Sequence, residues 1–306
     1  MTTSPGIYST EAVPRQPAIG AEAVLMQARS ENFPVASAFL PRRVRRQLLS
    51  IYGVARLIDD IGDEADGDRM AQLDWVAADL ERARSGGAVH PLVRRLGPTL
   101  DALDLSAQPF HDLIEANRMD QRVTRYETFD DLVAYCRLSA VPIGRLVLAV
   151  FGAGSADRLA AADDVCIGLQ VTEHLQDVGE DASRGRIYLP LRDLAACRVT
   201  EDDLAAEQAS APVRRLVAVE SARCRRLLGP GVGLARSLPW PQRAAVAGFV
   251  AGGHAALDAI QHGGYDVLGQ RCRPKPVRLA IRMAAVGLAR QDSAVGLARE
   301  DDGVAA

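Results

Sequence analysis

The sequence predicts an all-α protein built as one helical domain, and three observations support this prediction. Apolar residues recur at intervals of three and four along most of the 306 residues, which is the period of an amphipathic helix. Alternating strand patterns are almost absent. No linker rich in Pro, Ser or Gly and longer than a few residues divides the chain. We expect the domain over residues 23–283, after a disordered leader (1–22) and before a solvated tail (284–306) with a short duplication.

Composition and charge exclude several classes of protein. Hydrophobic residues at 48% and charged residues at 25% are ordinary globular values, so a sizeable core is available. A net charge of −3 gives no general attraction to nucleic acid. The five cysteines are scattered without a CxxC pair, which indicates reduced thiols in a cytoplasmic protein. The N-terminus lacks the pattern of a secretory signal, and no apolar stretch approaches 18 residues, so we expect no membrane-spanning segment.

The helices follow one another closely along the chain. Residues 43–64 carry apolar side chains at helical spacing, and 69–84 continue in the same manner until the turn residues of "SGGAVHP" end the pattern. Further helices are predicted over 90–103, 107–122, 129–152, 156–185, 199–207, 211–229, 239–268 and 276–291.

The end of the first helix, "ARLIDDIGDEAD", concentrates five acids beside a single arginine. On a helical wheel Asp59 and Asp63 extend the apolar stripe, whereas Asp60 and Glu64 form a second pair turned further outward. Like charges four residues apart destabilise a helix by roughly 0.2–0.5 kcal/mol per exposed pair. A purely structural helix gains no stability from these neighbouring negative charges. A divalent cation bound between them would make the interaction favourable. Arg56 has an alternative interpretation as the ion-pair partner of Asp60, four residues away.

A second polar stripe is predicted on the helix over 156–185, where Gln170, His174, Asp177 and Asp181 share one face. Basic residues follow directly in "SRGRIYLP". One acidic pair alone is more often a solvated face than a site. Two such pairs on separate helices, with arginines nearby, favour Mg²⁺ held together with an anionic ligand, because this ion binds through a few carboxylates and substrate phosphates.

These segments resemble the motifs of the squalene/phytoene synthases. "YGVARLIDDIGDE" resembles the first aspartate-rich motif of that family, "GLQVTEHLQDVGEDASRGRIYLP" the second, and "YCRLSAVPIGRLVL" the stretch between them. The segment "SENFPVASAFLPRRVRR" resembles the start of the hydroxysqualene synthase branch. The resemblance runs from about Ser30 to Val267. It implies the isoprenoid synthase fold, a single helical bundle around a central apolar cavity, with the two acidic motifs facing each other.

The resemblance also implies roles for individual residues. It assigns Mg²⁺ to Asp59 and Asp63 on one wall and to Asp177 and Asp181 on the other, and it makes these four and Tyr135, near the reacting carbons, the catalytic residues. The residues implied for binding the substrate and its diphosphate are Arg56, Gln170, Arg186, Tyr188, Asn32, Phe33 and Tyr265. Tyr135 and Phe33 have an alternative interpretation as core residues.

The function implied by the resemblance is a Mg²⁺-dependent ionisation of presqualene diphosphate, after which water captures the cation to give hydroxysqualene and diphosphate. The alternative is a head-to-head prenyl transferase that makes presqualene diphosphate or phytoene. A third hypothesis is a non-catalytic protein that binds isoprenoids, because Glu173 stands where the family commonly has Asn. The expected partners are a prenyl diphosphate substrate and companion enzymes of the squalene pathway. The expected location is cytoplasmic with contact to a membrane surface, because the products are very apolar.

Overall fold

The computed structural model describes residues 17, 24, 40–269 and 272. Within this part of the chain the elements are helices, and the only β-type pairing is an isolated bridge between Arg125 and Ile187. The helices are α3 (Arg42–Asp63), α4 (Arg69–Glu81), α5 (Pro91–Leu103), α6 (Gln108–Asp120), α7 (Phe129–Ser139), α8 (Val141–Val150), α9 (Ala156–Gln176), α10 (Val178–Ser183), α11 (Leu191–Cys197), α12 (Glu201–Leu204), α13 (Ala211–Leu228), α14 (Gly231–Arg236) and α15 (Gln242–His262). The all-α prediction is confirmed.

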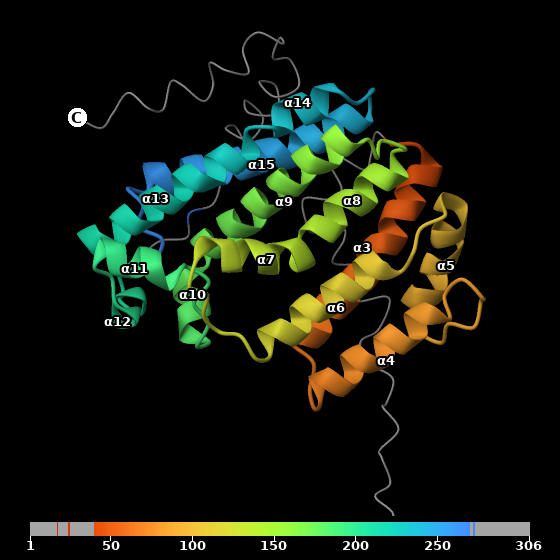
Figure 1. The fold of residues 1–306 in the computed structure, drawn as a ribbon, viewed down its shortest axis with the longest axis horizontal. Coiled ribbons are helices and arrows are strands. Elements are labelled where there is room, and N and C mark those ends of the chain that lie inside the picture. The colour runs from red at the N-terminus through yellow and green to blue at the C-terminus, as the bar shows by residue number, and fades with distance from the viewer. Residues whose placement is uncertain (1–16, 18–23, 25–39, 270–271, 273–306) are drawn as a thin grey trace, which may run out of the picture.

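Helix α9 runs through the middle of the bundle (Figure 1). It contacts α7 and α8 as well as α13, α14 and α15. The apolar residues form two hydrophobic clusters. The first cluster, built on α3, α4, α5 and α6 with part of α8, includes the fully buried Phe110 and Ile58. The second cluster is built on α7 and on the helices from α9 onward, and Phe151 packs against both clusters.

Two predicted helices are divided in the structure. The segment 129–152 breaks at Ala140 into α7 and α8, and Pro142 stands in the first turn of α8. Proline has no backbone N–H to donate and disfavours helical geometry in the residue before it, so a new helix begins there. The segment 156–185 breaks at Asp177, where φ is −108° and ψ is 13°. The short helices α11 and α14 were not predicted, and the helix predicted over 276–291 lies outside the described residues.

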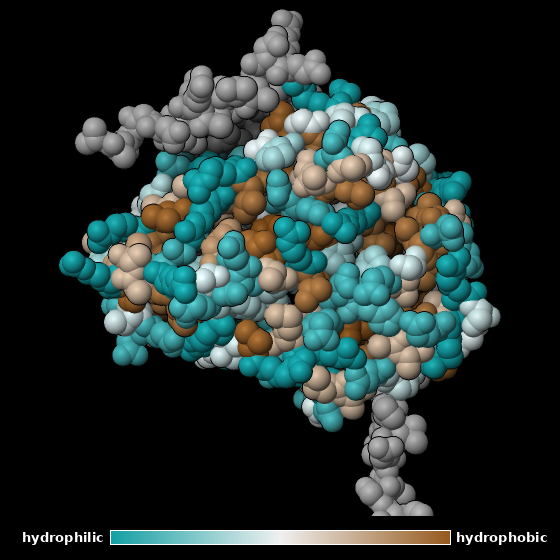
Figure 2. Space-filling model, viewed as in Figure 1, coloured by the Kyte–Doolittle hydropathy of each residue, from teal (hydrophilic) through white to brown (hydrophobic). Residues whose placement is uncertain are grey.

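The segment Phe129–Val150, which comprises α7 and α8, is long and apolar enough by length and composition to cross a membrane. The sequence analysis found no apolar stretch near 18 residues, so it missed this segment. Its two helices pack against α3, α6 and α9 inside the bundle. Hydrophilic side chains cover most of the face in Figure 2, and hydrophobic ones are visible between them. The large hydrophobic residues that are exposed in the described part of the chain are Val89, Val219, Trp240 and Phe249.

All five cysteines are free thiols, as the sequence predicts. Asn32 and Phe33 lie outside the described residues, as do most of the predicted leader and the whole predicted tail.

Candidate functional site

The acidic end of α3 exposes Asp59, Asp63 and Glu64 and buries Asp60, so the predicted outward position is confirmed for Glu64 but not for Asp60. Asp60 is buried and pairs with Arg56, whose Nε lies 2.7 Å from Asp60 Oδ1. Asp59 and Asp63 are exposed. The prediction that Asp60 turns outward is therefore wrong. The reason is that α3 contacts α4, α5, α6 and α8, so its buried surface is much wider than one apolar stripe. The ion-pair interpretation of Arg56 is confirmed.

A glycine brings α6 close to this end of α3. A methyl group at Gly62 would lie 1.8 Å from Oδ1 of Asn117, so only glycine permits the observed approach. Asn117 uses the space to donate a hydrogen bond from Nδ2 to Asp59 Oδ1 at 3.3 Å. The Gly62 carbonyl accepts from Arg69 Nη1 and Gln121 Nε2, each at 3.0 Å, which satisfies one of the carbonyl groups left free at a helix end.

Water reaches the carboxylate of Asp59, but protein atoms surround it closely enough to desolvate its charged form. This desolvation raises the pKa of Asp59 to about 7, and the negative charge of Asp63 adds to the effect. The hydrogen bond from Asn117 opposes it. A carboxylate in this state is electrostatically unsatisfied, and a cation beside it would be favourable.

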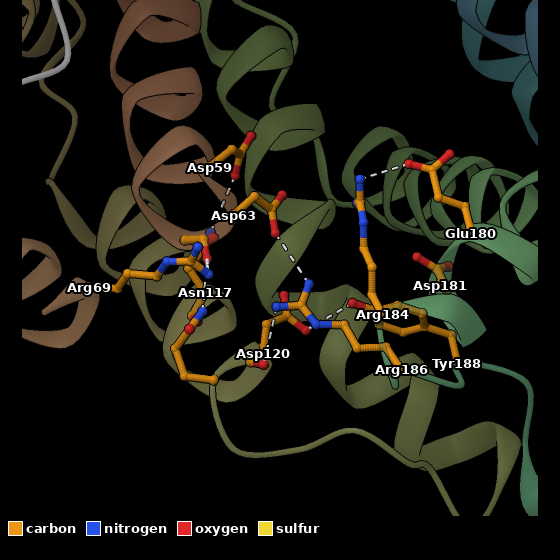
Figure 3. A network of polar contacts seen from close by, with 12 residues as sticks. Asp59, Asp63, Arg69, Asn117, Asp120, Glu180, Asp181, Arg184, Arg186 and Tyr188 are labelled. Carbon is orange, nitrogen blue, oxygen red and sulfur yellow. Dashed lines mark hydrogen bonds and ion pairs between the residues drawn. The ribbon is translucent and has the colours of Figure 1, made fainter. Parts of the chain in front are cut away.

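Arg186 connects the first acidic motif with the segment after the second. Its Nη1 donates to Asp63 Oδ1 at 3.2 Å, and its Nη2 donates to the backbone oxygen of Asp120 at 3.4 Å. Gly185, with φ of +78°, permits the turn after α10 that returns the chain toward α6. There Ile187 N donates to Thr124 O at 2.9 Å. Figure 3 shows Asp59 and Asp63 at one side of this group and Asp181 at the other, with Arg184 and Arg186 between them.

Asp120 joins the two tyrosines that the resemblance assigned to the site. Tyr135 OH donates to Asp120 Oδ2 at 2.7 Å, and Tyr188 OH donates to Asp120 Oδ1 at 3.1 Å. Burial raises the pKa of Asp120 and of both tyrosines. The sequence analysis did not identify Asp120. No local pattern in the sequence marks this residue, because the helix was predicted to continue to residue 122.

An aromatic group surrounds this carboxylate. The ring of His174 stacks on Tyr188 with centroids 3.7 Å apart, and Tyr126 stacks on the same tyrosine at 5.8 Å. The Tyr135 ring lies 5.5 Å from Tyr126 and 5.7 Å from Tyr188. The electron-rich faces of such rings attract cations. The hydroxyl of Tyr126 is buried and has no hydrogen-bond partner among the residues that the structure describes.

The second acidic motif is divided by the helix break. Gln170 Nε2 lies 3.3 Å from His174 Nε2, and His174 Nδ1 lies 3.9 Å from Asp181 Oδ2. Asp177, at the break, instead lines a cavity of about 670 Å³ with Glu180 and the apolar Leu204. Helical backbone hydrogen bonds continue across the break, from Asp177 N to Glu173 O at 3.1 Å and from Asp181 N to Asp177 O at 2.8 Å, so the stripe that includes Asp177 stays a prediction. Desolvation, followed by the charge of Asp181, raises the pKa of Asp177.

Two further predicted residues have clear positions. Glu173 is exposed on α9, and its backbone oxygen accepts a hydrogen bond from the Asp177 N–H at 3.1 Å. Tyr265 lies in the turn after α15, with φ of +59°, and its side chain packs against the second hydrophobic cluster. That turn is fixed to the start of α13 by Asp266, which pairs with Arg214 at 2.7 Å.

The carboxylates at this site suit Mg²⁺ only when a second ligand supplies further oxygen atoms. No three His, Cys, Asp or Glu side chains in the described part of the chain are gathered closely enough to hold a metal ion alone. Mg²⁺ is usually held by one or two carboxylates, with substrate phosphates and water completing its shell. Asp59 and Asp63 supply accessible carboxylates, and Arg186 beside them supplies donors for a phosphate. The residues therefore suit the ion when a diphosphate is present.

Comparison with known proteins gives consistent results. A hydroxysqualene synthase from Rhodopseudomonas palustris is 36% identical over 214 residues, which cover 69% of this chain and 72% of that protein. A phytoene synthase from Arthrospira platensis is 33% identical over 261 residues, covering 79% of this chain and 83% of that one.

Solved structures agree with the sequence comparisons. Squalene synthase HpnC from Alicyclobacillus acidocaldarius has a TM-score of 0.75 and 42% identity, covering 80% of this chain and 94% of its own. A dehydrosqualene synthase in complex with a ligand has a TM-score of 0.79 at 23% identity, over 87% of this chain and 94% of its own, and shares the fold. The family model described as squalene/phytoene synthase matches residues 26–279. The chain is therefore an enzyme of the squalene/phytoene synthase family, with its isoprenoid synthase fold.

Proposed function

We propose that the protein is a hydroxysqualene synthase, which ionises presqualene diphosphate and lets water capture the resulting cation. The observation that carries this proposal is the group at the end of α3, where exposed Asp59 and Asp63 lie beside Arg186 and the Asp120–tyrosine contacts. The relatives that bear the name hydroxysqualene synthase support the choice of branch. Because the chain belongs to a family of enzymes, we do not propose the alternative of a non-catalytic isoprenoid-binding protein.

We assign the diphosphate to the space between the two acidic motifs. Asp59 and Asp63 would hold Mg²⁺ from α3, and Asp181, together with Asp177 after a local rearrangement at the helix break, would do so from α10. Bound Mg²⁺ supplies Lewis-acid neutralisation of the charge that develops on the leaving diphosphate.

The chain's own residues contribute binding and orientation. Arg186 has donors matched to two phosphate oxygens, and Asp63 accepts from one of these donors at 3.2 Å. Arg56 and Gln170 are proposed as further contacts to the diphosphate. Tyr135 and Tyr188 hold their hydroxyl oxygens at Asp120 within the aromatic group, and we place the path of the cation beside this group.

The direct test is an assay of the purified protein with presqualene diphosphate and Mg²⁺. The expected products are hydroxysqualene and inorganic diphosphate, identified by mass spectrometry. If turnover occurs only with farnesyl or geranylgeranyl diphosphate, the enzyme is instead a condensing prenyl transferase. The phytoene synthases among the relatives are the observation that favours this second candidate.

Variants at the acidic end of α3 test the assignment of the site. Asp63→Asn keeps the size of the side chain and removes its charge, so we expect diphosphate release to fall by about a hundredfold or more. Asp112→Asn, at an acid on α6 that accepts a hydrogen bond from Gln108 on the same helix, is the matched control. Equal loss in both variants would contradict the assignment.

We also propose that the protein works in the cytoplasm against a membrane surface, since its substrate and product are mostly hydrocarbon. Sedimentation with liposomes that contain the product, compared with product-free liposomes, measures this association. Equal recovery in the supernatant under both conditions would contradict it.

A further inference from the structure

We propose that Asp120 is a positioning residue, which orients the hydroxyl groups of Tyr135 and Tyr188 and thereby decides how the carbocation is quenched. This proposal rests on the proposed function and names the group that would favour water capture over loss of a proton.

The geometry is that of a carboxylate shared by two phenols. Each oxygen of Asp120 accepts one hydroxyl, from Tyr135 at 2.7 Å and from Tyr188 at 3.1 Å. The two tyrosines come from distant parts of the chain, one from α7 and one from the segment after α10. The two residues are 4% and 8% exposed, so neither hydroxyl has ready access to bulk water. The backbone oxygen of Asp120 also accepts from Arg186, which fixes the end of α6 to the same segment.

Stability alone does not favour an acid at this place. Asp120 is the last residue of α6, where the negative end of the helix dipole opposes a negative side chain. Burial disfavours the charge and raises the pKa of Asp120, although the two tyrosine hydroxyls and the charge of Arg186 oppose this effect, and Asp63 adds a smaller repulsion. A residue that is unfavourable in these ways nevertheless makes two well-formed hydroxyl contacts, which is the pattern expected of a functional constraint.

The chemical consequence follows from the direction of the hydrogen bonds. A phenolic hydroxyl can donate or accept, whereas an ionised carboxylate only accepts. Both hydroxyl hydrogens therefore point at Asp120, and the oxygen lone pairs of the tyrosines are turned away from it. Burial and the negative charge of Asp120 raise the pKa of both phenols, so they stay protonated. Fixed oxygen dipoles of this kind stabilise a nearby cation without reorganisation.

The two ways of quenching the cation differ in one bond. In water capture, a water oxygen forms a C–O bond to the cationic carbon and one of its protons passes to the released diphosphate. In elimination, a carbon next to the cation loses its proton to the same diphosphate and a C=C bond forms. A cation held steadily by oriented hydroxyls survives long enough for water to add, whereas a mobile hydroxyl can direct its hydrogen at the cation and destabilise it.

The test replaces Asp120 by a residue of the same size. In Asp120→Asn the amide oxygen accepts from one tyrosine while the NH₂ group faces the other, so one hydroxyl must reverse. With presqualene diphosphate and Mg²⁺, we expect the ratio of hydroxysqualene to elimination products to fall by about tenfold. Asp112→Asn should leave the ratio unchanged. An unchanged ratio in Asp120→Asn would overturn the proposal.

A double-mutant cycle separates positioning from a general structural role. In the background Tyr135→Phe/Tyr188→Phe the hydroxyls are absent, so we expect Asp120→Asn to change the product ratio no further. A full additional change would show that Asp120 does not act through the tyrosines. Thermal melts of all variants check that the fold is retained.

A readout without substrate keeps this proposal distinct from the proposed function. The near-ultraviolet absorbance of tyrosine, followed during an alkaline titration, should give a lower titration midpoint for the buried tyrosines in Asp120→Asn than in the unmodified protein, because a negative neighbour is lost. An unchanged midpoint would overturn the contacts themselves. If the unmodified protein instead releases no diphosphate from presqualene diphosphate, the proposed function fails while this readout still reports on Asp120.

Discussion

Glu220 on α13 is a buried carboxylate in the second cluster, away from the candidate site. Its Oε1 lies 2.8 Å from Arg223 Nη1, and the same nitrogen lies 2.5 Å from Asp193 Oδ2. Desolvation outweighs the attraction of Arg223 and raises the pKa of Glu220 to about 7. One guanidinium shared by two carboxylates does not fully compensate the second charge.

This raised pKa makes stability depend on pH in a defined direction. The unfolded chain releases the Glu220 proton near pH 4.5, whereas the folded protein holds it to about pH 7. The contribution to stability is therefore lost as pH rises between these values. In Glu220→Gln the side chain no longer titrates. The free energy of unfolding of this variant, relative to that of the unmodified protein, should therefore rise by about 1–3 kcal/mol from pH 5 to pH 8. Urea unfolding at the two pH values measures this difference, and a difference that is constant with pH would contradict it.

Arg186 gives a second prediction at the scale of one residue. Its guanidinium already spans two acceptors, Asp63 and the backbone of Asp120. Lysine keeps the charge but loses the paired donors, so we expect kcat/KM to fall by about tenfold in Arg186→Lys and by about a hundredfold in Arg186→Gln. Steady-state assays of diphosphate release provide the measurement. If both variants kept the activity of the unmodified protein, neither the charge nor the paired donors of Arg186 would contribute to binding the diphosphate.

Single residues also show where sequence analysis succeeds and where it fails. The resemblance led to Tyr135, Tyr188 and Arg186, which the structure brings together around one carboxylate. That carboxylate, Asp120, was missed because its partners are 15 and 68 residues away, so no local pattern marks it. The roles of Asp59 and Asp63 stay predictions, and the helical wheel did not predict their exposure, because a wheel carries no information on how many neighbours a helix has.

At the scale of elements, the contact between α3 and α6 depends on Gly62. Gly62→Ala would place a methyl group against the Asn117 side chain and push it away from Asp59. We expect a destabilisation of about 1–3 kcal/mol, together with weaker binding of Mg²⁺ and diphosphate. The matched control is Gly252→Ala in the interior of α15, where a methyl group meets nothing within 4 Å.

The control has the opposite expected sign. Alanine in the interior of a helix is favoured over glycine by roughly 0.5–1 kcal/mol where there is space for its methyl group, so Gly252→Ala should raise the unfolding midpoint. Chemical denaturation measures both variants. Destabilisation of the same size at both positions would show that the approach of α6 to α3 is not specific.

The elements themselves were largely predictable. The start and end of α3 fall within a residue of the predicted 43–64, because amphipathic spacing is continuous there. Apolar spacing continues through the breaks at Ala140 and Asp177, so periodicity shows neither of them. The family resemblance implies a helix break within "YCRLSAVPIGRLVL", and the break at Ala140 confirms it. Pro142 is a local reason for the first break. For the second, at Asp177, the sequence carries no comparable signal.

At the scale of the whole molecule, the candidate site lies where the two hydrophobic clusters meet. Asp59 and Asp63 end a helix of the first cluster, whereas Tyr135 and Tyr188 belong to the second. Arg186 joins the two sides through Asp63 and Asp120. A ligand that bridges both motifs therefore contacts elements of both hydrophobic clusters. The fold class was predictable from helical periodicity, but this division was not, because it depends on contacts between distant helices.

The proposed site requires carboxylates from both acidic motifs to bind one diphosphate through Mg²⁺. A calorimetric titration with inorganic diphosphate, with and without Mg²⁺, examines this requirement in the unmodified chain and in Asp63→Asn, Asp181→Asn and Asp112→Asn. We expect binding only with Mg²⁺, weakened by at least about tenfold, or 1.4 kcal/mol, in each of the first two variants and unchanged in the third. Binding that is equally tight without Mg²⁺, or unaffected by either of the first two substitutions, would contradict the proposed site.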